Sequence, residues 1–216
     1  MASPAFSTSA VRPFPHLIAI AGPSCAGKTS LAQGLVSALP NAVHFPLDAY
    51  YLDRSHLPPS QRADCNFDAP TALDGKLLYA HVRALSQGDP VDVPTYDFHS
   101  HCRGSVTHRI NPPTYLLVEG LFALYFPPLL PLYSYRIYVD VDADICLQRR
   151  IIRDVEQRGR TPEDIREQFT QHVAPMAQRY LHPTRRRADC IVQGTDDLSD
   201  LVSRIANVCK TIKIRP

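Results

Sequence analysis

Residues 17–29 read LIAIAGPSCAGKT, an apolar run followed by a loop with two glycines and the start of a helical pattern. Residues 17–21 are wholly apolar, which indicates a short strand buried on both faces of a sheet. From Thr29 onward, apolar residues recur at helical spacing until Pro40 ends the pattern. The stretch therefore predicts a buried strand, a tight loop and an amphipathic helix, in that order.

The loop itself, residues 22–29, matches the pattern G-x-x-x-x-G-K-[ST]. Gly22 and Gly27 allow the backbone to curl so that successive N–H groups point at a phosphate, and the following helix adds the positive end of its dipole. In this pattern Lys28 reaches the β- and γ-phosphates, and the hydroxyl of Thr29 ligates Mg²⁺. We expect a nucleotide to bind through Gly22, Ser24, Cys25, Ala26, Gly27, Lys28, Thr29 and Ser30.

Strands and helices alternate along the rest of the chain. Further strands are expected at residues 42–47, 115–118, 136–141 and 190–193, and further helices at 77–85, from Ala143 onward and at 198–209. Pro46 suits a short or edge strand, because proline cannot donate to a central ladder. The alternation predicts an α/β fold with a mostly parallel five-stranded sheet flanked by helices. We expect a disordered leader at 1–15 and a single domain over 16–216.

Two of the expected strands end in carboxylates. Residues 116–119 read LLVE, and Asp48 follows the second strand. The carboxyl ends of parallel strands open onto the ligand crevice, so Glu119 could hold Mg²⁺ directly or through water. Asp48 is placed to position a hydroxyl and to take its proton in phosphoryl transfer. The alternatives are a solvated glutamate at a strand end and an aspartate that caps a helix.

A long insertion separates the second strand from the third. About 65 residues lie between Asp48 and the strand at 115–118, whereas a simple crossover needs about 10 to 15. We expect an insertion over about 52–112, with one helix and a small hairpin near 94–110. Its aromatic side chains could stack on a base, each contributing about 1–3 kcal/mol, although such residues more often belong to a core. The expected substrate-binding residues here are Tyr51, Phe67, Asp68, Tyr96, Phe98, His101 and Arg103.

Residues 149–160 read RRIIRDVEQRGR, with several arginines three or four residues apart on a helical face. Like charges at that spacing destabilise a helix by a few tenths of a kcal/mol each, so an anionic ligand is expected. The alternative is internal ion pairing, because Asp154 lies four residues from both Arg150 and Arg158, and Glu156 lies four residues from Arg160. These two carboxylates, however, cannot occupy all five arginines. We therefore expect residues 149–170 to form a lid over the nucleotide, with one of its arginines stabilising the transferring phosphate.

Composition narrows the possible partners. The net charge of +2 argues against a general nucleic-acid binder. Prolines and charges interrupt the apolar segment 115–141, which therefore fails as a membrane span, and the N-terminus lacks the apolar core of a signal peptide. The six widely spaced cysteines are expected to be reduced thiols in a cytoplasmic protein.

With these features in place, the chain resembles the uridine kinase (uridine–cytidine kinase) family of P-loop kinases over about residues 16–206. The matching segments are GPSCAGKTS, LDAYY, SHLPPSQRADCNFDAPTALD, VPTYDFHSHCR, VEGLFAL, DADICLQRRIIRDVEQRGR and HPTRRRADCIV. The resemblance implies transfer of the ATP γ-phosphate to the 5′-hydroxyl of uridine or cytidine, in pyrimidine salvage. It also implies a homotetramer.

The same resemblance implies roles for individual residues. Asp48 would be the base that faces the 5′-hydroxyl, and Thr29, Asp48 and Glu119 would surround Mg²⁺. Asp68 and Arg150 would hold the ribose, while Tyr96 and His101 would bind the pyrimidine edge. The remaining implied contacts are Phe67 and Phe98 on the ring, Arg153 and Arg158 on the phosphates, Arg160 and Gln168 in the closed acceptor pocket, and Asp196 near the adenine.

Two other readings stay open at this stage. A related kinase on the same scaffold could act on another hydroxyl, such as that of pantothenate, ribulose 5-phosphate or nicotinamide riboside. Alternatively, the chain could be a regulatory module that binds ATP without turnover. The aromatic residues of the insertion favour a nucleoside, and Lys28, Asp48, Glu119 and the arginines favour an enzyme.

Overall fold

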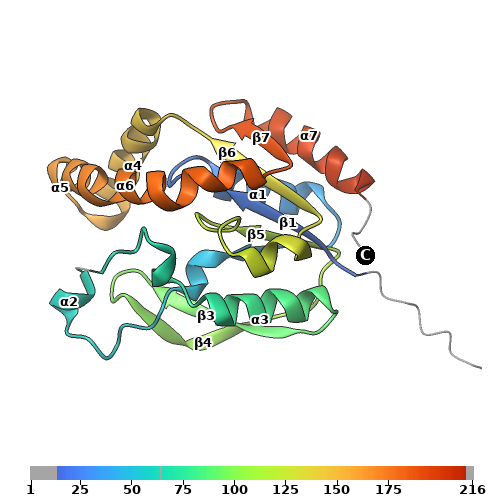
Figure 1. Ribbon diagram of the computed structural model, residues 1–216, viewed down its shortest axis with the longest axis horizontal. Coiled ribbons are helices and arrows are strands. Elements are labelled where there is room, and N and C mark those ends of the chain that lie inside the picture. The colour runs from blue at the N-terminus through green and yellow to red at the C-terminus, as the bar shows by residue number, and fades with distance from the viewer. Residues whose placement is uncertain (1–13, 64, 213–216) are drawn as a thin grey trace, which may run out of the picture.

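The computed structural model describes residues 14–63 and 65–212. Within them, five strands form one sheet in the order β2-β5-β1-β6-β7, and every neighbouring pair is parallel. The strands are β1 (His16–Ala21), β2 (Ala42–Pro46), β5 (Tyr115–Glu119), β6 (Tyr135–Asp140) and β7 (Cys190–Gln193). The predicted α/β fold with a five-stranded parallel sheet is confirmed, and β2 lies at the edge, as Pro46 indicated (Figure 1).

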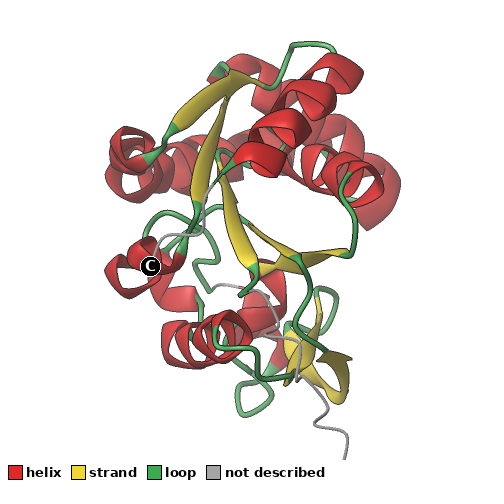
Figure 2. Cartoon of the chain, turned by 90° about the vertical axis from the view of Figure 1, so that its right-hand side faces the viewer, coloured by secondary structure: helices red, strands yellow, loops and turns green. Residues whose placement is uncertain are grey.

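Helices cover both faces of this sheet (Figure 2). They are α1 (Lys28–Ala38), α4 (Ala143–Arg158), α5 (Pro162–Gln168), α6 (Ala174–Met176) and α7 (Leu198–Thr211), with two π-helical turns, η4 (Phe169–Val173) and η5 (Ala177–Leu181), and the 3₁₀ turns η3 (Pro127–Leu132) and η6 (His182–Arg187). Alternate residues of β1 enter two separate cores. Leu17 and Ala19 pack on one side, and Ile18 and Ile20 pack with α1 and α7 on the other. The continuous apolar run of β1 follows from this double burial.

The segment between β2 and β5 forms a separate layer at the lower side of Figure 1. It contains the 3₁₀ turns η1 (Leu47–Tyr50) and η2 (Pro70–Ala72), the helices α2 (Pro59–Ala63) and α3 (Gly75–Ser86), and the strands β3 (Val91–Asp97) and β4 (Cys102–Ile110). β3 and β4 pair antiparallel, which confirms the predicted hairpin. Asp74 caps α3 by accepting a hydrogen bond from the amide of Leu77 at 3.0 Å.

The parallel register places the two strand-end carboxylates at the same edge of the sheet. Glu119, the last residue of β5, pairs with Ile20 of β1 on one side and with Pro46 of β2 on the other. Asp48 follows two residues after Pro46, in the first turn of η1. The predicted leader falls almost wholly on residues 1–13, which lie outside the described residues.

Candidate active site

The loop between β1 and α1 curls through residues with positive φ. Gly22 has φ 148°, Gly27 has φ 97°, and Cys25 has φ 63° although it is not glycine. A Cβ on Gly22 would overlap the carbonyl oxygen of Val139, so glycine is required there. Such a run of left-handed and extended residues turns backbone N–H groups toward one concavity, which suits an anion.

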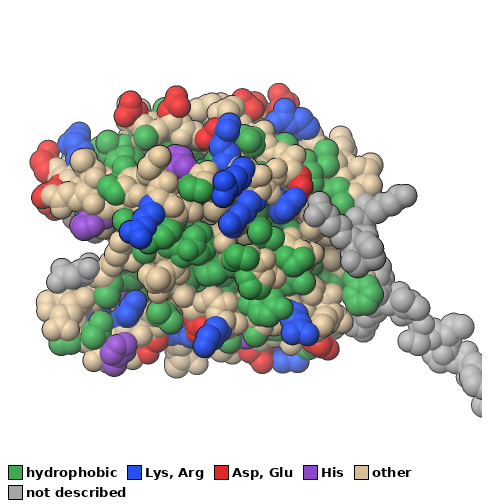
Figure 3. Space-filling view, viewed as in Figure 1, with side chains coloured by type: hydrophobic (Ala, Val, Ile, Leu, Met, Phe, Trp, Pro, Cys, Tyr) green, Lys and Arg blue, Asp and Glu red, His purple; other side chains and the backbone are tan. Residues whose placement is uncertain are grey.

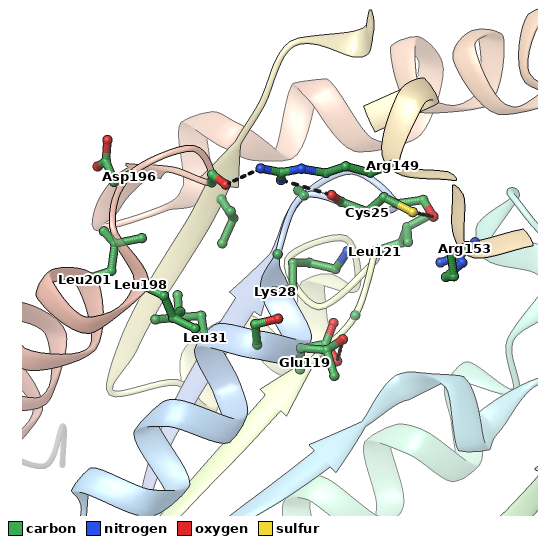
Figure 4. Close-up of a pocket in the computed structure, with 18 of the residues that line it drawn as sticks. Cys25, Lys28, Leu31, Glu119, Leu121, Arg149, Arg153, Asp196, Leu198 and Leu201 are labelled. Atoms are coloured by element: carbon green, nitrogen blue, oxygen red, sulfur yellow. Dashed lines mark hydrogen bonds between the residues drawn. The ribbon is translucent and has the colours of Figure 1, made fainter. Parts of the chain in front are cut away.

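Side chains at the start of α1 complete this concavity (Figure 4). Lys28 is buried, and its Nζ donates to the carbonyl oxygen of Pro23 at 2.7 Å, which keeps the ammonium group beside the loop. The exposed Thr29 donates through Oγ1 to Oε2 of Glu119 at 3.2 Å. A side-chain hydrogen bond therefore joins the end of the phosphate loop to the end of β5.

Arg149 on α4 braces the loop from above, a contact that the sequence did not predict. Its Nη1 donates to the carbonyl oxygen of Cys25 at 3.3 Å, and its Nη2 donates to that of Gly194 at 3.1 Å (Figure 4). A cleft of about 580 Å³ lies against these groups. Asp196, Leu198 and Leu201 form its far wall.

The two strand-end carboxylates differ in their electrostatics. Asp48 is open to the cleft but enclosed by protein on its other sides; this burial raises its pKa, and the charge of Glu119 raises it further against the opposing effect of Lys28 and the arginines. Burial would also raise the pKa of Glu119, but the hydrogen bond from His44, together with Lys28 and Thr29, lowers it. The pKa values of the two carboxylates are thus shifted in opposite directions. Asp48 suits the role of a proton acceptor, and Glu119 suits that of a carboxylate that stays ionised.

His44 on β2 is a further residue that the sequence did not predict. Its Nε2–H donates to Oε2 of Glu119 at 3.2 Å, the same oxygen that accepts from Thr29. His44 and Pro46 lie on one face of β2, and Pro46 is the register partner of Glu119. The contact depends on how β2 and β5 align, and no local pattern encodes that alignment.

A second cavity, of about 740 Å³, opens beside the phosphate loop. Its walls come from the insertion on one side and from α4 and α5 on the other, where Figure 3 shows a notch in the left edge of the molecule. Nearly all of the expected acceptor residues line it: Asp48, Tyr51, Phe67, Asp68, Tyr96, Phe98, His101, Arg150, Arg160 and Gln168. Arg153 and Arg158, which were expected to contact the phosphates, line it too. We call it the acceptor cavity.

Aromatic rings make up one wall of the acceptor cavity. Phe67 stacks on His101 with ring centroids 4.6 Å apart and an interplanar angle of 20°. Tyr51 contacts Phe67, Tyr96 and Phe98 at centroid distances of 5.6, 5.3 and 6.2 Å. These side chains therefore form a cavity wall, and Tyr51 also anchors that wall to the core.

Two polar groups on this wall lack protein partners within the described part of the chain. The hydroxyl of Tyr96 and Nδ1 of His101 are buried without a hydrogen bond. Burial raises the pKa of Tyr96 to about 12, and burial together with the charge of Arg158 lowers that of His101. Both side chains are thus neutral near pH 7 and suit an uncharged polar ligand, because buried polar groups normally find partners.

The arginine segment contains part of the ion pairing that the alternative interpretation described. Asp154 contacts Arg150, Arg153 and Arg158 together. Arg160 bonds to Oε1 of Gln168, where the sequence suggested Glu156 as its alternative partner. Arg160 does not follow the helical spacing because α4 ends at Arg158, and the left-handed φ of 62° at Gly159 turns the chain away from the helical face.

Arg103 does not line the acceptor cavity, in contrast to the expectation. Its guanidinium donates to the carbonyl oxygens of Tyr51 at 3.0 Å and Tyr50 at 3.4 Å, and to Asp74 at 3.2 Å. Three acceptors therefore occupy the side chain, which fastens the hairpin to η1 and α3. Arg103 therefore stabilises the position of Tyr51, which is part of the aromatic wall, without contacting the cavity itself.

The donor set near the loop fits Mg²⁺. Thr29, Asp48 and Glu119 supply a hydroxyl and two carboxylates around the mouth of the nucleotide cleft. Mg²⁺ prefers oxygen ligands and usually takes one or two carboxylates together with substrate phosphates. Among the described residues, no group of three or more His, Cys, Asp or Glu side chains is arranged to hold a metal.

Comparison with known proteins identifies the family. The sequence model of the Phosphoribulokinase / Uridine kinase family matches residues 17–199. The chain belongs to this family. A uridine kinase from Chloroflexus aurantiacus is 43% identical over 183 residues, covering 84% of this chain and 88% of the relative. One from Deinococcus deserti is 39% identical over 187 residues, covering 86% and 89%.

Solved structures show the same fold at lower sequence identity. A putative fructose transport system kinase from Silicibacter sp. TM1040 superposes with a TM-score of 0.70 at 20% identity, covering 85% of this chain and 92% of that one. This likeness supports the P-loop kinase fold alone. Among the helices described, none is long and apolar enough to cross a membrane.

Proposed function

We propose that this chain transfers the γ-phosphate of ATP to the 5′-hydroxyl of uridine, and of cytidine, to give the nucleoside monophosphate. The observation that carries the proposal is the position of Asp48, which lines both the nucleotide cleft and the acceptor cavity. A carboxylate at that junction can contact a hydroxyl on one side and face the terminal phosphate on the other. The uridine kinases that match most of the chain support the choice of acceptor.

On the nucleotide side, the backbone of the phosphate loop and Lys28 would hold the triphosphate, and Asp196 would lie near the adenine. Arg153, which lines both cavities, and Arg158 would neutralise the charge on the transferring phosphoryl group. Thr29, Asp48 and Glu119 would hold Mg²⁺, which would supply further neutralisation of the phosphate charge.

On the acceptor side, Asp48 would hold the 5′-hydroxyl in line with the terminal phosphorus. The O–H proton passes to the carboxylate late in the step, as the oxygen–phosphorus bond forms and the bond to the leaving ADP breaks. The raised pKa of Asp48 makes it the better proton acceptor of the two strand-end carboxylates.

The walls of the acceptor cavity would select the nucleoside. The unpartnered hydroxyl of Tyr96 and Nδ1 of His101 would bond to the edge of the pyrimidine, and Phe67 and Phe98 would pack on its ring. Asp68 and Arg150 would hold the ribose hydroxyls, with Arg160 and Gln168 closing that end. In this proposal, residues 52–112 act as the acceptor-binding insertion and 149–170 as the lid.

We also propose a cytoplasmic homotetramer that acts in pyrimidine salvage. All six cysteines fall in described residues and are free thiols, which supports a reducing compartment. The assembly rests on the family resemblance.

The proposal is tested with labelled ATP·Mg²⁺ and a panel of hydroxyl compounds. The panel contains uridine, cytidine, adenosine, pantothenate, ribulose 5-phosphate and nicotinamide riboside. We expect monophosphates from uridine and cytidine. Product from another acceptor alone would replace the assignment of a pyrimidine nucleoside, and absence of product with every acceptor would favour a module that binds ATP without turnover.

A further inference from the structure

Asp154 lies at the centre of the arginine segment and is wholly buried, with 0% of its surface exposed. Its Oδ1 accepts a hydrogen bond from Nε of Arg153 at 2.8 Å and lies 3.6 Å from Nη1 of Arg158. Its Oδ2 lies 3.5 Å from Nε of Arg150. The two oxygens of one carboxylate therefore face different arginines.

The backbone of Asp154 organises the same region. The α4 helix ends on its carbonyl oxygen, which accepts from the amides of Gly159 and Arg160, the latter at 3.2 Å. Asp154 thus fixes, through its main chain, the point at which the lid segment turns away from the helix.

Gln168 on α5 extends this arrangement toward the acceptor. Its Oε1 accepts from Nη2 of Arg150 at 3.2 Å and from Nη1 of Arg160. Arg150 is therefore held between Asp154 and Gln168. The contacts run without a break from Arg153 and Arg158, through Asp154 and Arg150, to the residues that close the acceptor cavity.

We propose that Asp154 is a positioning residue that couples nucleotide binding to nucleoside binding. The inference rests on the proposed function and adds to it the means by which one site senses the other. Asp154 itself is buried behind the arginines and lines neither cavity. It acts through Arg150, Arg153 and Arg158.

The direction of coupling follows from charge sharing. Without ligands, the carboxylate of Asp154 interacts with three arginines at once, so no single arginine has the whole of its charge as a partner. When nucleotide phosphates attract Arg153 and Arg158, the carboxylate is left to Arg150, because a buried carboxylate without a partner is strongly unfavourable. Arg150 then has a narrower range of positions beside Gln168, and the nucleoside binds more tightly. By linkage, the nucleoside must tighten nucleotide binding by the same factor.

The test measures the dissociation constant of uridine by calorimetry, with and without a saturating non-hydrolysable ATP analogue and Mg²⁺. For the wild type we expect uridine to bind about 5-fold tighter or more with the analogue present, within the usual range of coupling between sites. Asp154→Asn keeps the shape of the side chain but removes its charge, and should reduce this ratio below about twofold. Glu156→Gln removes an exposed carboxylate from the same helix and should leave the ratio unchanged.

A wild-type ratio near one, or a full ratio in Asp154→Asn, would overturn the proposal. If Asp154→Asn does not fold, Asp154→Glu takes its place: moving the carboxylate by one methylene should at least halve the ratio, and an unchanged ratio would refute the coupling. If uridine does not bind to the wild type at all, the assigned acceptor is wrong, and the same ratio is measured with whichever acceptor the kinase panel identifies.

Discussion

The phosphate loop and the acceptor cavity meet at Asp48, but they are built in different ways. The loop is one run of eight residues, and its shape comes from backbone angles that glycine permits at Gly22 and Gly27. The acceptor cavity collects side chains from η1, the hairpin, α4 and α5, which lie far apart in the sequence. Backbone geometry therefore determines where phosphate can bind, and side chains determine which hydroxyl reaches it.

This difference predicts two kinds of mutational effect. Changes at the junction should reduce turnover whatever the acceptor. Changes on the aromatic wall should alter the affinity for the acceptor and leave the chemistry intact. The predictions below run from the largest expected effect to the smallest.

Asp48→Asn should have the largest effect, because it removes the proton acceptor at the junction. We expect kcat to fall about 10²–10⁴-fold, with the affinity for the ATP analogue little changed. Steady-state kinetics and calorimetry measure the two quantities. Asp92→Asn, an exposed carboxylate on β3, is the matched control. A mutant within about threefold of wild type would remove Asp48 from its proposed role.

Arg158→Ala should reduce kcat about 10²-fold, in keeping with the loss of one charged group that stabilises the transition state. Ground-state affinity for the ATP analogue should fall much less, because Lys28 and the loop backbone remain. Arg166→Ala removes an exposed arginine of α5 and should have no effect. Equal losses in turnover and affinity would show that Arg158 acts in binding alone.

His44→Leu should raise the Mg²⁺ concentration needed for half-maximal activity by about 10-fold, since residues that orient a metal ligand typically contribute 10–100-fold. The substitution removes the donor that helps to fix Oε2 of Glu119 and to lower its pKa. Mn²⁺ binding followed by electron paramagnetic resonance provides a measurement independent of activity. His44→Gln keeps a donor and should recover part of the affinity; no change in either variant would rule out this role.

The pH dependence of uridine affinity should be the mildest effect. The pKa of His101 lies below its ordinary value of 6.5, so the ring is neutral, and the affinity should be constant, between about pH 7 and 8. At lower pH, protonation turns its acceptor nitrogen into a donor and places a second cation near Arg158, and affinity should fall. Calorimetry from pH 5.5 to 8 measures this profile.

Two variants sharpen that measurement. Arg158→Ala removes a charge that lowers the pKa of His101, so the loss of affinity should begin at a higher pH. His101→Asn removes the titrating group, so the affinity for uridine should no longer fall at low pH on account of this residue. If both variants show the same dependence of uridine affinity on pH as the wild type, a group other than His101 is responsible for it.

The same contrast explains how much could be predicted from the sequence. The loop, the alternating strands and helices, and the edge position of β2 depend on local spacing and on Pro46, and all were predicted. The aromatic residues of the insertion were recognisable as candidates, but their assembly into one wall depends on how the hairpin packs against η1.

Contacts between distant segments could not be predicted. The bond from His44 to Glu119 depends on the register of two parallel strands. Arg103 was expected to contact a ligand, yet backbone carbonyls of η1 and its C-terminal neighbour occupy it, and no sequence pattern marks a carbonyl as an available acceptor. Closer in sequence, the alternative of internal ion pairing placed Asp154 with the arginines four residues away, and Asp154 does contact Arg150 and Arg158, but its contact with the adjacent Arg153 was not predicted.

The most direct test of the account is the position of the phosphate on the product of the reaction with uridine. Proton-coupled ³¹P nuclear magnetic resonance distinguishes the ester sites, because a 5′-phosphate couples to two ribose protons and a 2′- or 3′-phosphate to one. If Asp48 directs the 5′-hydroxyl to the terminal phosphorus, the product signal is a triplet. A doublet would show that a different hydroxyl enters the junction, and would contradict the proposed arrangement.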